Sequence, residues 1–379
     1  MSELRRKILL ESKKIVIKIG SNILVDSTQG GVNTGWIENF TKSVAQLKKA
    51  GKEVVIVSSG AVGTGMAVLG YDTKPEAMEV KQACAAVGQI DLMYAYRQSF
   101  AQLGIASAQI LLSADDFRDR QRYKNLQSTL KALLAHQVVP VINENDSVVV
   151  NEIKVGDNDK LSSDVALFWD ADLLLIFTDE DGLYEENPKT NPQARLLQYV
   201  PEIDAKIMDM AGKPGQTGSA VSTGGMHSKL VAIKAATQGG CNAFLANGAK
   251  ISPHQVVLEG GRGTFFAGAA NPLNHRKRWL SLVSTPKGKV VIDPGAVKAL
   301  RKKHSSLLPV GVVQVKGNFD AKELIEVTDT SGNSVARGLS SLGSEKLKLV
   351  MGQNTRDIGC RFGDDIPTEL IHKNDLMLL

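Results

Sequence analysis

The sequence is poor in cysteine and in aromatic residues, and its charges nearly balance. Only three cysteines occur in 379 residues, Cys84, Cys241 and Cys360, and they lie far apart without a CxxC pair. An odd, scattered set of this kind excludes a disulfide framework and argues against a zinc site. Lysine and arginine exceed aspartate and glutamate by 45 − 40 = 5. This excess is too small to indicate a nucleic-acid-binding protein by itself.

Long apolar runs are also missing. No stretch approaches the roughly 18 consecutive apolar residues that a membrane-spanning helix needs. The first residues, MSELRRKILLES, lack an apolar core followed by a small-residue cleavage site, so we expect no secretory signal. At about 150 residues per domain, the length predicts more than one domain. We therefore expect a soluble, cytoplasmic protein of two domains that does not contact a membrane.

Short β-branched runs alternate with helical patterns over the first two thirds of the chain. Continuous apolar runs are typical of strands buried on both faces of a sheet. Four of them occur, at residues 15–19, 53–57, 138–143 and 173–178. Between them, apolar residues recur at helical spacing, as from Ile37 to Leu47 before Gly51. This alternation predicts an α/β domain with a mainly parallel, open sheet sandwiched by helices.

The pattern changes near residue 271. The segment NPLNHRKRWLSL carries a proline and a basic cluster, and short runs with glycine-bearing turns follow: VVIDPG, GVVQVKGNF, ELIEVTDTSGNSVARG and KLKLVMG. Strands at such short spacing indicate a second, smaller β-rich domain such as a barrel, interrupted by one helix over 295–303. We therefore expect a first domain over 1–270, a linker over 271–285 and a second domain over 286–379.

The first predicted strand carries a lysine and ends in a glycine turn. Lys18 lies inside the apolar run, and Gly20 and Ser21 follow at its carboxyl end, the edge where ligands bind in open α/β sheets. Glycine lets backbone N–H groups approach an anion, and lysine adds a positive charge. An ordinary strand-end turn with a lysine that reaches to solvent fits this short segment equally well.

A loop of small residues follows the second predicted strand. The segment SSGAVGTGM places Ser58, Ser59 and Gly60 before a helix, and it matches neither GK[ST] nor GxGxxG. Such a loop suits an anion at a helix N-terminus. Close packing of a helix on the sheet through Gly63 and Gly65 is the alternative.

Short polar side chains are dense between the last two of these strands. VINENDSV follows a strand and VGDNDKLSSDVA opens a helix, so Asp146, Asn158 and Asp159 fall in one short stretch. These residue types suit a site for an amino group and hydroxyl-like donors. They also suit helix capping. A metal site is a third reading, but the spacing of a calcium-binding EF-hand is absent.

Two further segments carry candidate groups for a nucleotide. Thr178 and Asp179 end the last long strand, where they suit a contact to a base or ribose, with turn chemistry as the alternative. The segment STGGMHSKL places glycines before a helix that contains Lys229, an arrangement that delivers a lysine to an anion. None of the six histidines lies in a nucleophile pattern with serine or cysteine, so a Ser-His-Asp triad is not expected.

Taken together, these segments resemble the amino acid kinase family, and within it the kinases that act on the side chain of glutamate. The resemblance rests on KIGSNIL, IVSSGAVGTG, KQACAAVGQ, VINENDSV, EIKVGDNDKLSS, TDEDGLYEENP and STGGMHSK, which occur in the family's order and approximate spacing. The last third, with DPGAVKAL, SSLLPVGVVQVKGNF and IHKNDLMLL, resembles the PUA domain appended to many bacterial members. The sequence departs from the family pattern at Ser222, His227 and Ser228, and at Asp320 to Lys322, where a glycine commonly ends a turn.

The resemblance implies a phosphotransferase that moves the γ-phosphoryl group of Mg-ATP to the γ-carboxylate of L-glutamate. The product is L-glutamyl 5-phosphate, which begins proline synthesis. The catalytic residues that it implies are Lys18, Asp159 and Lys229, with Asp159 orienting the two lysines. The glutamate-binding residues are Ser59, Gly60, Asp146 and Asn158. The ATP-binding residues are Lys18, Gly20, Ser21, Thr178, Asp179, Thr223, Gly224, Gly225, Met226 and Lys229.

The same resemblance implies ATP and Mg²⁺ as cofactors, with the metal held mainly by nucleotide phosphates and water. It also implies inhibition by proline, a homo-oligomer, and glutamyl-phosphate reductase as the partner that takes the labile product. PUA domains often occur in RNA-binding proteins, and basic stretches run through 275–278 and 301–303. Residues 285–379, however, carry an excess of only 14 − 11 = 3 positive charges, so we do not expect RNA as a partner. The other alternative is a non-catalytic amino-acid sensor. The presence of both Lys18 and Lys229 argues against it, because a sensor does not need two lysines for phosphoryl transfer.

Overall fold

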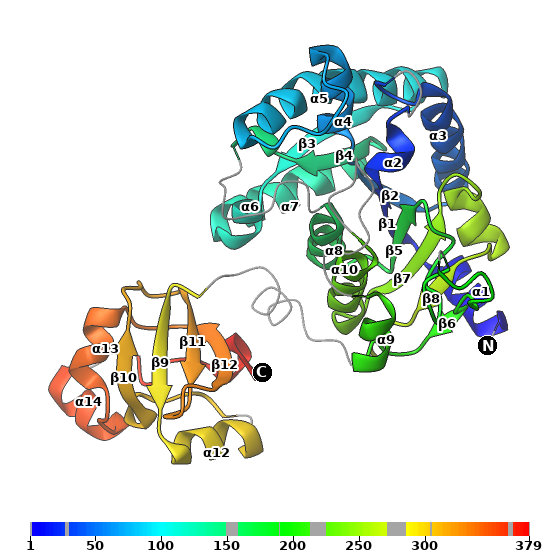
Figure 1. Cartoon of the computed structure of the whole chain (residues 1–379). Coiled ribbons are helices and arrows are strands. Elements are labelled where there is room, and N and C mark those ends of the chain that lie inside the picture. Colours follow the sequence, from blue (N-terminus) through cyan, green and yellow to red (C-terminus); the bar gives the residue numbers. More distant parts are fainter. Residues whose placement is uncertain are drawn as a thin grey trace. The chain divides into compact units, whose positions relative to one another are not determined.

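The computed structural model of the chain describes residues 2–26, 30–148, 158–188, 190–212, 225–270, 286–303, 305–362 and 367–378. The chain divides into two compact units, Met1–Pro272 and Leu273–Leu379 (Figure 1). The predicted linker over 271–285 lies outside the described residues, and so does the basic stretch at 275–278. Within the described ranges, no helix has the length and apolarity that crossing a membrane requires.

An eight-stranded sheet forms the centre of the first unit, in the order β3-β4-β2-β1-β5-β7-β8-β6 (Figure 1). Its strands are β1 Lys14–Ile19, β2 Glu53–Val57, β3 Ser107–Leu112, β4 Val139–Glu144, β5 Leu173–Thr178, β6 Tyr199–Val200, β7 Asn242–Asn247 and β8 Thr264–Phe266. The six strands from β3 to β7 in this order pair in parallel, and β8 is antiparallel to β7. The predicted mainly parallel α/β sheet is confirmed.

Parallel pairing places the carboxyl ends of the central strands at one edge of this sheet. Lys18 of β1 lies opposite Val57 of β2 and Ile176 of β5, and Val57 lies opposite Ile142 of β4. The segments that follow β1, β2, β4 and β5 therefore all begin at this edge. From β1, the chain builds the sheet first toward β2 on one side and later from β5 toward β7 on the other side. The strand order therefore reverses between β1 and β5, and open α/β sheets bind ligands at such a position.

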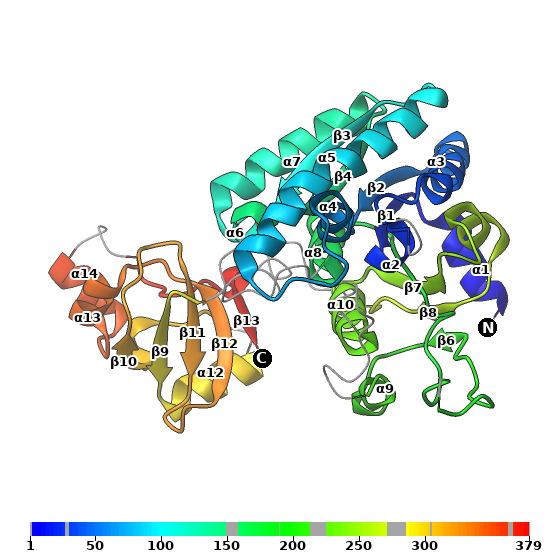
Figure 2. The same ribbon diagram turned by 45° about the horizontal axis from the view of Figure 1, so that its top comes forward.

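Helices cover both faces of the sheet (Figures 1 and 2). They are α1 Ser2–Glu11, α2 Ser21–Leu24, α3 Thr34–Lys49, α4 Ala61–Leu69, α5 Met78–Gln102, α6 Ala114–Arg118, α7 Arg120–Ala135, α8 Asn158–Trp169, α9 Ala205–Met210 and α10 Met226–Gln238, with the short turns η1 Asp146–Val148 and η2 Gln255–Glu259. Ile15, Ile17 and Ile19 pack into the core that includes α3 and α5. Because side chains alternate along a strand, Lys18 points to the opposite face, where α8 packs against β1.

The long helix α5 was not expected from the sequence. Its segment KQACAAVG carries small residues that let α4 and α5 approach closely. A Cβ added to Gly65 of α4 would lie 1.8 Å from the Cys84 carbonyl oxygen, and one on Gly88 of α5 would lie 2.1 Å from that of Ala61. Gly65 therefore allows close helix packing and does not form part of an anion site. The packing is between two helices, whereas the sequence alternative was packing of a helix on the sheet. Cys84 is buried between these helices' small residues.

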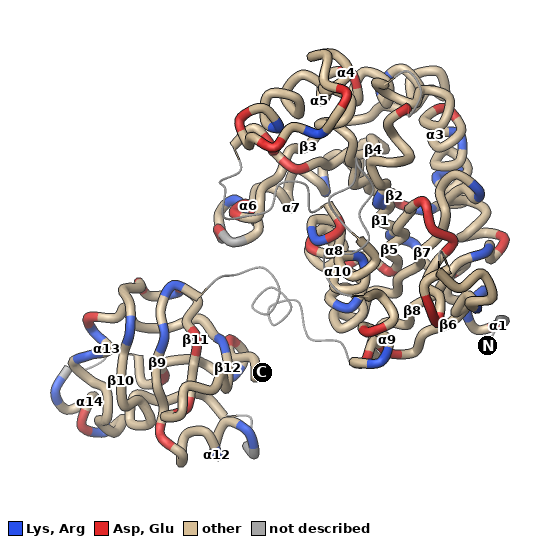
Figure 3. The backbone as a smooth tube through the Cα atoms, in the orientation of Figure 1, with Lys and Arg blue, Asp and Glu red and all other residues tan. Residues whose placement is uncertain are grey.

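The second unit contains a five-stranded sheet in the order β10-β9-β11-β12-β13. Its elements are β9 Gly288–Ile292, α12 Pro294–Lys303, β10 Val312–Lys316, β11 Leu324–Thr328, β12 Ser334–Leu339, α13 Ser344–Val350, α14 Thr355–Phe362 and β13 Leu376–Leu378. Strands β9 and β11 are parallel, and the other neighbours are antiparallel. The predicted β-rich unit is confirmed, and its described strands end at β10 and β13 without closing into a barrel. Acidic and basic residues are interspersed over both units (Figure 3).

The prediction of a strand at KLKLVMG was wrong, because this segment forms α13, and α14 adds a further helix that was not predicted. Alternating lysine and leucine mimic a strand, but Leu347 and Val350 are buried while Leu349 is 60% exposed. A spacing of three between buried residues is that of a helix. Lys322, at the departure noted in the sequence, has φ of +72°. This left-handed conformation costs a non-glycine residue about 1–2 kcal/mol, which explains why glycine is common there.

Candidate active site

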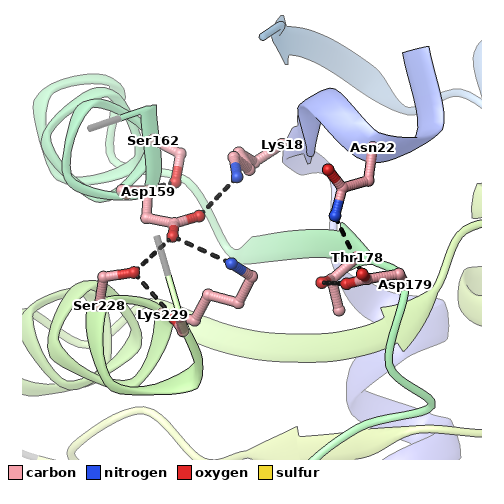
Figure 4. A network of polar contacts seen from close by, with 9 residues as sticks. Lys18, Asn22, Asp159, Ser162, Thr178, Asp179, Ser228 and Lys229 are labelled. Atoms are coloured by element: carbon pink, nitrogen blue, oxygen red, sulfur yellow. Dashed lines mark hydrogen bonds and ion pairs between the residues drawn. The ribbon is translucent and has the colours of Figure 1, made fainter. Parts of the chain in front are cut away.

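A buried carboxylate at the carboxyl edge of the sheet joins two lysines (Figure 4). Asp159, the second residue of α8, lies 2.6 Å through Oδ1 from Nζ of Lys18 and 3.3 Å through Oδ2 from Nζ of Lys229. All three side chains are buried, and together they carry a formal charge of 2 − 1 = +1. Burial alone would raise the pKa of Asp159, but the two ammonium groups hold it far below its usual range. Asp159 is therefore ionised throughout the physiological range.

Three elements bring this cluster together. Lys18 projects from β1 onto the face covered by α8, and α8 packs against α10, whose first turn contains Lys229. Ser228 Oγ donates a hydrogen bond of 2.9 Å to Asp159 Oδ2. One carboxylate thus fixes both ammonium groups, an arrangement that suits the orienting role implied for Asp159. Ser228 was not among the predicted site residues, although it could have been predicted because it directly precedes Lys229.

The end of β5 and the turn after β1 are linked by polar contacts. Asp179 accepts hydrogen bonds from Asn22 Nδ2 at 3.0 Å and from Thr178 Oγ1 at 2.9 Å (Figure 4). The N–H of Gly20 donates to the Phe177 carbonyl oxygen at 3.1 Å. Burial raises the pKa of Asp179, but the hydrogen bonds to its carboxylate and the charge of Lys229 together lower the pKa below its usual value. Asn22 was not among the predicted site residues, although it belongs to the motif KIGSNIL, from which a role in the site could have been predicted.

The remaining predicted ATP-binding residues lie at helix N-termini or outside the described ranges. Ser21 is the first residue of α2. Gly225 precedes α10 in an extended conformation, and Met226 is the first residue of that helix. Thr223 and Gly224 lie outside the described residues. Contacts between these residues and ATP stay predictions.

The end of β2 leads into the N-terminus of α4 through Ser59 and Gly60. Ser59 is buried, and Gly60 has φ of +95°, a left-handed conformation that glycine adopts without strain. The preceding Ser58 turns inward, since its hydroxyl lies 3.2 Å from that of Tyr96. The part of the small-residue loop that remains for a ligand is therefore Ser59-Gly60 at the start of the helix.

Asp146 and Asn158 present buried oxygens that the described part of the chain leaves without a partner. Asp146 begins η1 after β4, and Asn158 begins α8. They are 7% and 6% exposed, and Oδ1 of each accepts no hydrogen bond from any described residue. Burial and the nearby Glu144 carboxylate raise the pKa of Asp146 to about 7, an effect that Lys74 opposes. Two unsatisfied acceptors of this kind suit a ligand that donates, such as an ammonium group.

Comparison with known proteins places these features in a family. The Amino acid kinase family matches residues 13–247, and the PUA domain matches residues 288–359. Glutamate 5-kinase of Geobacter sulfurreducens is 42% identical over 377 residues, which cover 99% of this chain and 100% of the relative. Glutamate 5-kinase of Paramagnetospirillum magneticum is 41% identical over 370 residues, covering 98% and 99%.

The chain belongs to the glutamate 5-kinases of the amino acid kinase family. Another member, from Dictyoglomus thermophilum, is 41% identical over 369 residues, covering 97% of this chain and 98% of the relative. Lys18, Asp159 and Lys229 all lie within the part that matches the amino acid kinase family. Membership in this family makes the protein a kinase with a C-terminal PUA domain, as the sequence motifs indicated.

Proposed function

We propose that the protein transfers the γ-phosphoryl group of Mg-ATP to the γ-carboxylate of L-glutamate. The product, L-glutamyl 5-phosphate, is the first intermediate of proline synthesis. The observation that carries the proposal is the buried cluster of Lys18, Asp159 and Lys229 at the ligand-binding edge of the sheet, in a chain of this family. A cluster with net positive charge suits the oxygens of a phosphoryl group in transit.

The chemistry requires charge stabilisation rather than a base. A glutamate side chain has a pKa of about 4.3, so its carboxylate is already ionised at neutral pH. The barrier lies in bringing this anion to a more strongly charged one, and phosphoryl transfer is mostly positioning and electrostatic stabilisation. Lys18 and Lys229 supply the positive charge. Asp159 holds both ammonium groups in place beforehand, so little reorganisation is needed during the reaction.

The amino-acid substrate is assigned to the opposite side of the cluster from the nucleotide. The unsatisfied oxygens of Asp146 and Asn158 accept from its ammonium group. Ser59 and Gly60, at the N-terminus of α4, present backbone N–H groups and a helix dipole that favour a carboxylate. With the ammonium group and the α-carboxylate held, the γ-carboxylate at the other end of the molecule reaches toward Lys18.

ATP is assigned to the edge between β1 and β5 and to the start of α10. Gly20 and Ser21 follow β1, Thr178 and Asp179 end β5, and residues 223–226 precede Lys229. Mg²⁺ prefers oxygen ligands and usually keeps waters and substrate phosphates among them. The oxygens of Asp159 are already taken by the two lysines. We therefore expect nucleotide phosphates and water to hold most of the Mg²⁺ coordination, where the ion neutralises phosphate charge.

A coupled assay of ADP release tests the proposed reaction. We expect ADP release with L-glutamate and Mg²⁺, and much less with L-aspartate or N-acetyl-L-glutamate. Aspartate is one methylene too short to reach the phosphoryl group, and N-acetylglutamate lacks the ammonium group that pairs with Asp146. Hydroxylamine should trap the acyl phosphate as a hydroxamate. Faster ADP release with N-acetylglutamate than with glutamate would contradict the assignment.

Proline is proposed as an inhibitor that binds in the glutamate pocket. It shares the α-carboxylate and carries a secondary amine that Asp146 and Asn158 can accept from. Proline should therefore raise the apparent KM for glutamate, and Asp146→Asn should weaken the binding of both ligands. Calorimetry decides between shared and separate pockets, because simultaneous, independent binding of proline and glutamate would exclude the shared pocket.

We also propose that the kinase forms a homo-oligomer and passes its product to glutamyl-phosphate reductase. Ile90 and Tyr94 of α5 are 71% and 62% exposed, which gives an apolar surface that a second copy would cover. An acyl phosphate is labile in water, so transfer to a nearby reductase protects it. Sedimentation equilibrium of the kinase, alone and mixed with the reductase, tests both associations.

A further inference from the structure

Gln89 of α5 has a buried polar atom for which the described chain provides no partner. This atom is the side-chain nitrogen Nε2, a hydrogen-bond donor. The unsatisfied atoms of Asp146 and Asn158 are acceptors. A buried donor without a partner is destabilising, so it is expected to meet an acceptor in a bound ligand or in water. The segment KQACAAVGQ is one of the motifs that mark the family, and its small residues pack α5 against α4. This packing does not involve the polar end of Gln89.

The contacts of Asn143 determine which way the Gln89 amide points. Oδ1 of Asn143 accepts the backbone N–H of Glu144 at 2.9 Å, so Nδ2 is the Asn143 atom left to bond with Gln89. Asn143 Nδ2 donates to Gln89 Oε1 at 2.8 Å. The amide of Gln89 therefore uses its oxygen at the end of β4 and keeps its NH₂ group for another acceptor.

Gln89 lies between the two loops assigned to the amino-acid substrate. Its neighbour Gly88 is in close contact with Ala61, the residue directly after Ser59-Gly60. On the other side, the bond to Asn143 reaches the end of β4, three residues before Asp146. Helix α5 also packs against η1, which begins with Asp146. Packing thus brings Gln89 to the same pocket from a third element.

We propose that Gln89 donates a hydrogen bond through Nε2 to the α-carboxylate of the amino-acid substrate and so positions it. This inference rests on the proposed function. Asp146 and Asn158 accept from the α-ammonium group, and the carboxylate on the same carbon has room for a further donor beside the N–H groups at Ser59-Gly60. Gln89 is anchored to the strand end that leads into Asp146, so its NH₂ group serves the α end of glutamate rather than the γ-carboxylate near Lys18.

Two variants separate the donor from the packing of the side chain. Gln89→Glu keeps an oxygen that accepts from Asn143 Nδ2 but replaces the donor with a second oxygen, and Gln89→Leu removes both polar atoms. Gln46→Leu on the exposed side of α3 is the matched control. Melting temperatures of all variants report whether each one folds. The ligands are L-glutamate and 4-aminobutyrate, which keeps the amine and the reacting carboxylate but lacks the α-carboxylate.

Both Gln89 variants should raise the KM for glutamate about ten- to a hundredfold, as expected for a lost charge-assisted hydrogen bond. The KM for ATP and the constant for 4-aminobutyrate, measured as a substrate or as a competitive inhibitor, should stay within about threefold in the same variants. Gln46→Leu should leave all constants unchanged. The ratio of the constants for glutamate and 4-aminobutyrate is the decisive measurement, because a merely structural role of Gln89 would not change this ratio.

Equal losses for both ligands would overturn the proposal, because Gln89 would then not read the α-carboxylate. An unchanged KM for glutamate would also overturn it and show that water satisfies Nε2. If the wild-type protein shows no glutamate-dependent ADP release, the proposed function itself is wrong. Calorimetric titration of the wild-type and Gln89→Glu proteins with glutamate still decides the role of Gln89 in that case.

Discussion

Asp159 and Asp146 are both buried acids at the same edge of the sheet, yet their surroundings drive their pKa values in opposite directions. Two lysines and Ser228 contact Asp159, and its pKa lies far below the usual range. Asp146 has an oxygen without a described partner and a neighbouring carboxylate, and its pKa rises to about 7. The difference separates a charge that the protein pairs by itself from one to which the described residues leave an oxygen without a partner.

The two environments fit two different tasks. Around Asp159, opposite charges are already paired, so the lysines are held in position before any phosphate arrives. Around Asp146, the described chain offers little positive charge beyond Lys74, and an incoming ammonium group would complete the pair. The first aspartate would therefore govern stability and the chemical step, and the second would govern substrate affinity. Five substitutions test this division, from the largest effect to the smallest.

Asp159→Asn should produce the largest loss of stability. Removing this charge leaves two buried ammonium groups facing one another, and breaking a buried ion pair costs about 3–5 kcal/mol. Chemical denaturation measures the change in the free energy of unfolding. Glu11→Gln is the control, because the Lys7–Glu11 pair is exposed on both sides and such pairs contribute about 0–1 kcal/mol. Equal stability of the two variants would contradict the electrostatic account of the cluster.

The same variant should change how stability responds to acid. The folded-state pKa of Asp159 is lower than its value in the unfolded chain. Its contribution is therefore present above about pH 4 and is lost as the pH falls toward the folded-state pKa. Asp159→Asn should reduce the slope of stability against pH in this acidic range.

Lys18→Met and Lys229→Met should each lower kcat about a hundred- to a thousandfold, as removal of one charge-stabilising donor does. The KM for glutamate should change much less, because positive charge matters most while the phosphoryl group moves. Steady-state kinetics measures both constants. Lys250→Met serves as the control, because this lysine is 67% exposed and pairs with Asp181 instead. A folded Lys18 or Lys229 variant with near wild-type kcat would refute the assigned role.

Much of the fold could be predicted from the sequence, because its signals are local. The buried strands β1, β2, β4 and β5 are continuous apolar runs, and α3 and α7 show clear helical spacing. The elements that were missed have weaker patterns. Helix α5 is built around small residues whose role appears only against α4, as at Gly65 and Gly88. The alternating segment of α13 follows the period of a strand, and only tertiary packing decides that Leu347 and Val350 are buried.

The site could be predicted where a motif carries its own signal. Lys18, Asp159 and Lys229 lie in recognisable segments, and the structure brings them together. Ser228 and Asn22 were missed because their partners, Asp159 and Asp179, lie 69 and 157 residues away in the chain. Gln89, which we propose as a further binding residue, was missed for the same reason, since its polar environment comes from Asn143 on another element. Contacts of this kind depend on packing that no single segment encodes.

Asp146→Asn and Asn158→Ala should mainly raise the KM for glutamate, by about ten- to a hundredfold. Asp146→Asn removes the negative charge assigned to the ammonium group, Asn158→Ala removes an acceptor, and a hydrogen bond to a charged group contributes about 1.5–3 kcal/mol. The KM for ATP should change little, because the nucleotide is assigned to the other side of the Asp159 cluster. Steady-state kinetics with either substrate varied checks this. An unchanged KM for glutamate with an altered KM for ATP would show that the two pockets are misassigned.

The pH dependence of glutamate binding distinguishes the two aspartates most directly. With a pKa of about 7 in the ligand-free protein, Asp146 is largely protonated at pH 6. Its folded-state pKa exceeds the unfolded value, so this group makes the ligand-free protein less stable as the pH rises from about 4 to 7. An ammonium group pairs only with the ionised carboxylate, so glutamate binding must release a proton in this range. The KM for glutamate should therefore rise about tenfold between pH 8 and pH 6.

Asp159 remains ionised over this whole range, and the γ-carboxylate of the substrate, with a pKa of about 4.3, is ionised as well. Asp146→Asn should thus give a KM for glutamate that is higher at pH 8 but nearly independent of pH. Calorimetry of glutamate binding at pH 6 in two buffers of different ionisation enthalpy counts the proton released. The wild-type protein should release close to one proton and Asp146→Asn none. Equal proton release by both proteins would mean that another group titrates, and the contrast between the two aspartates would fail.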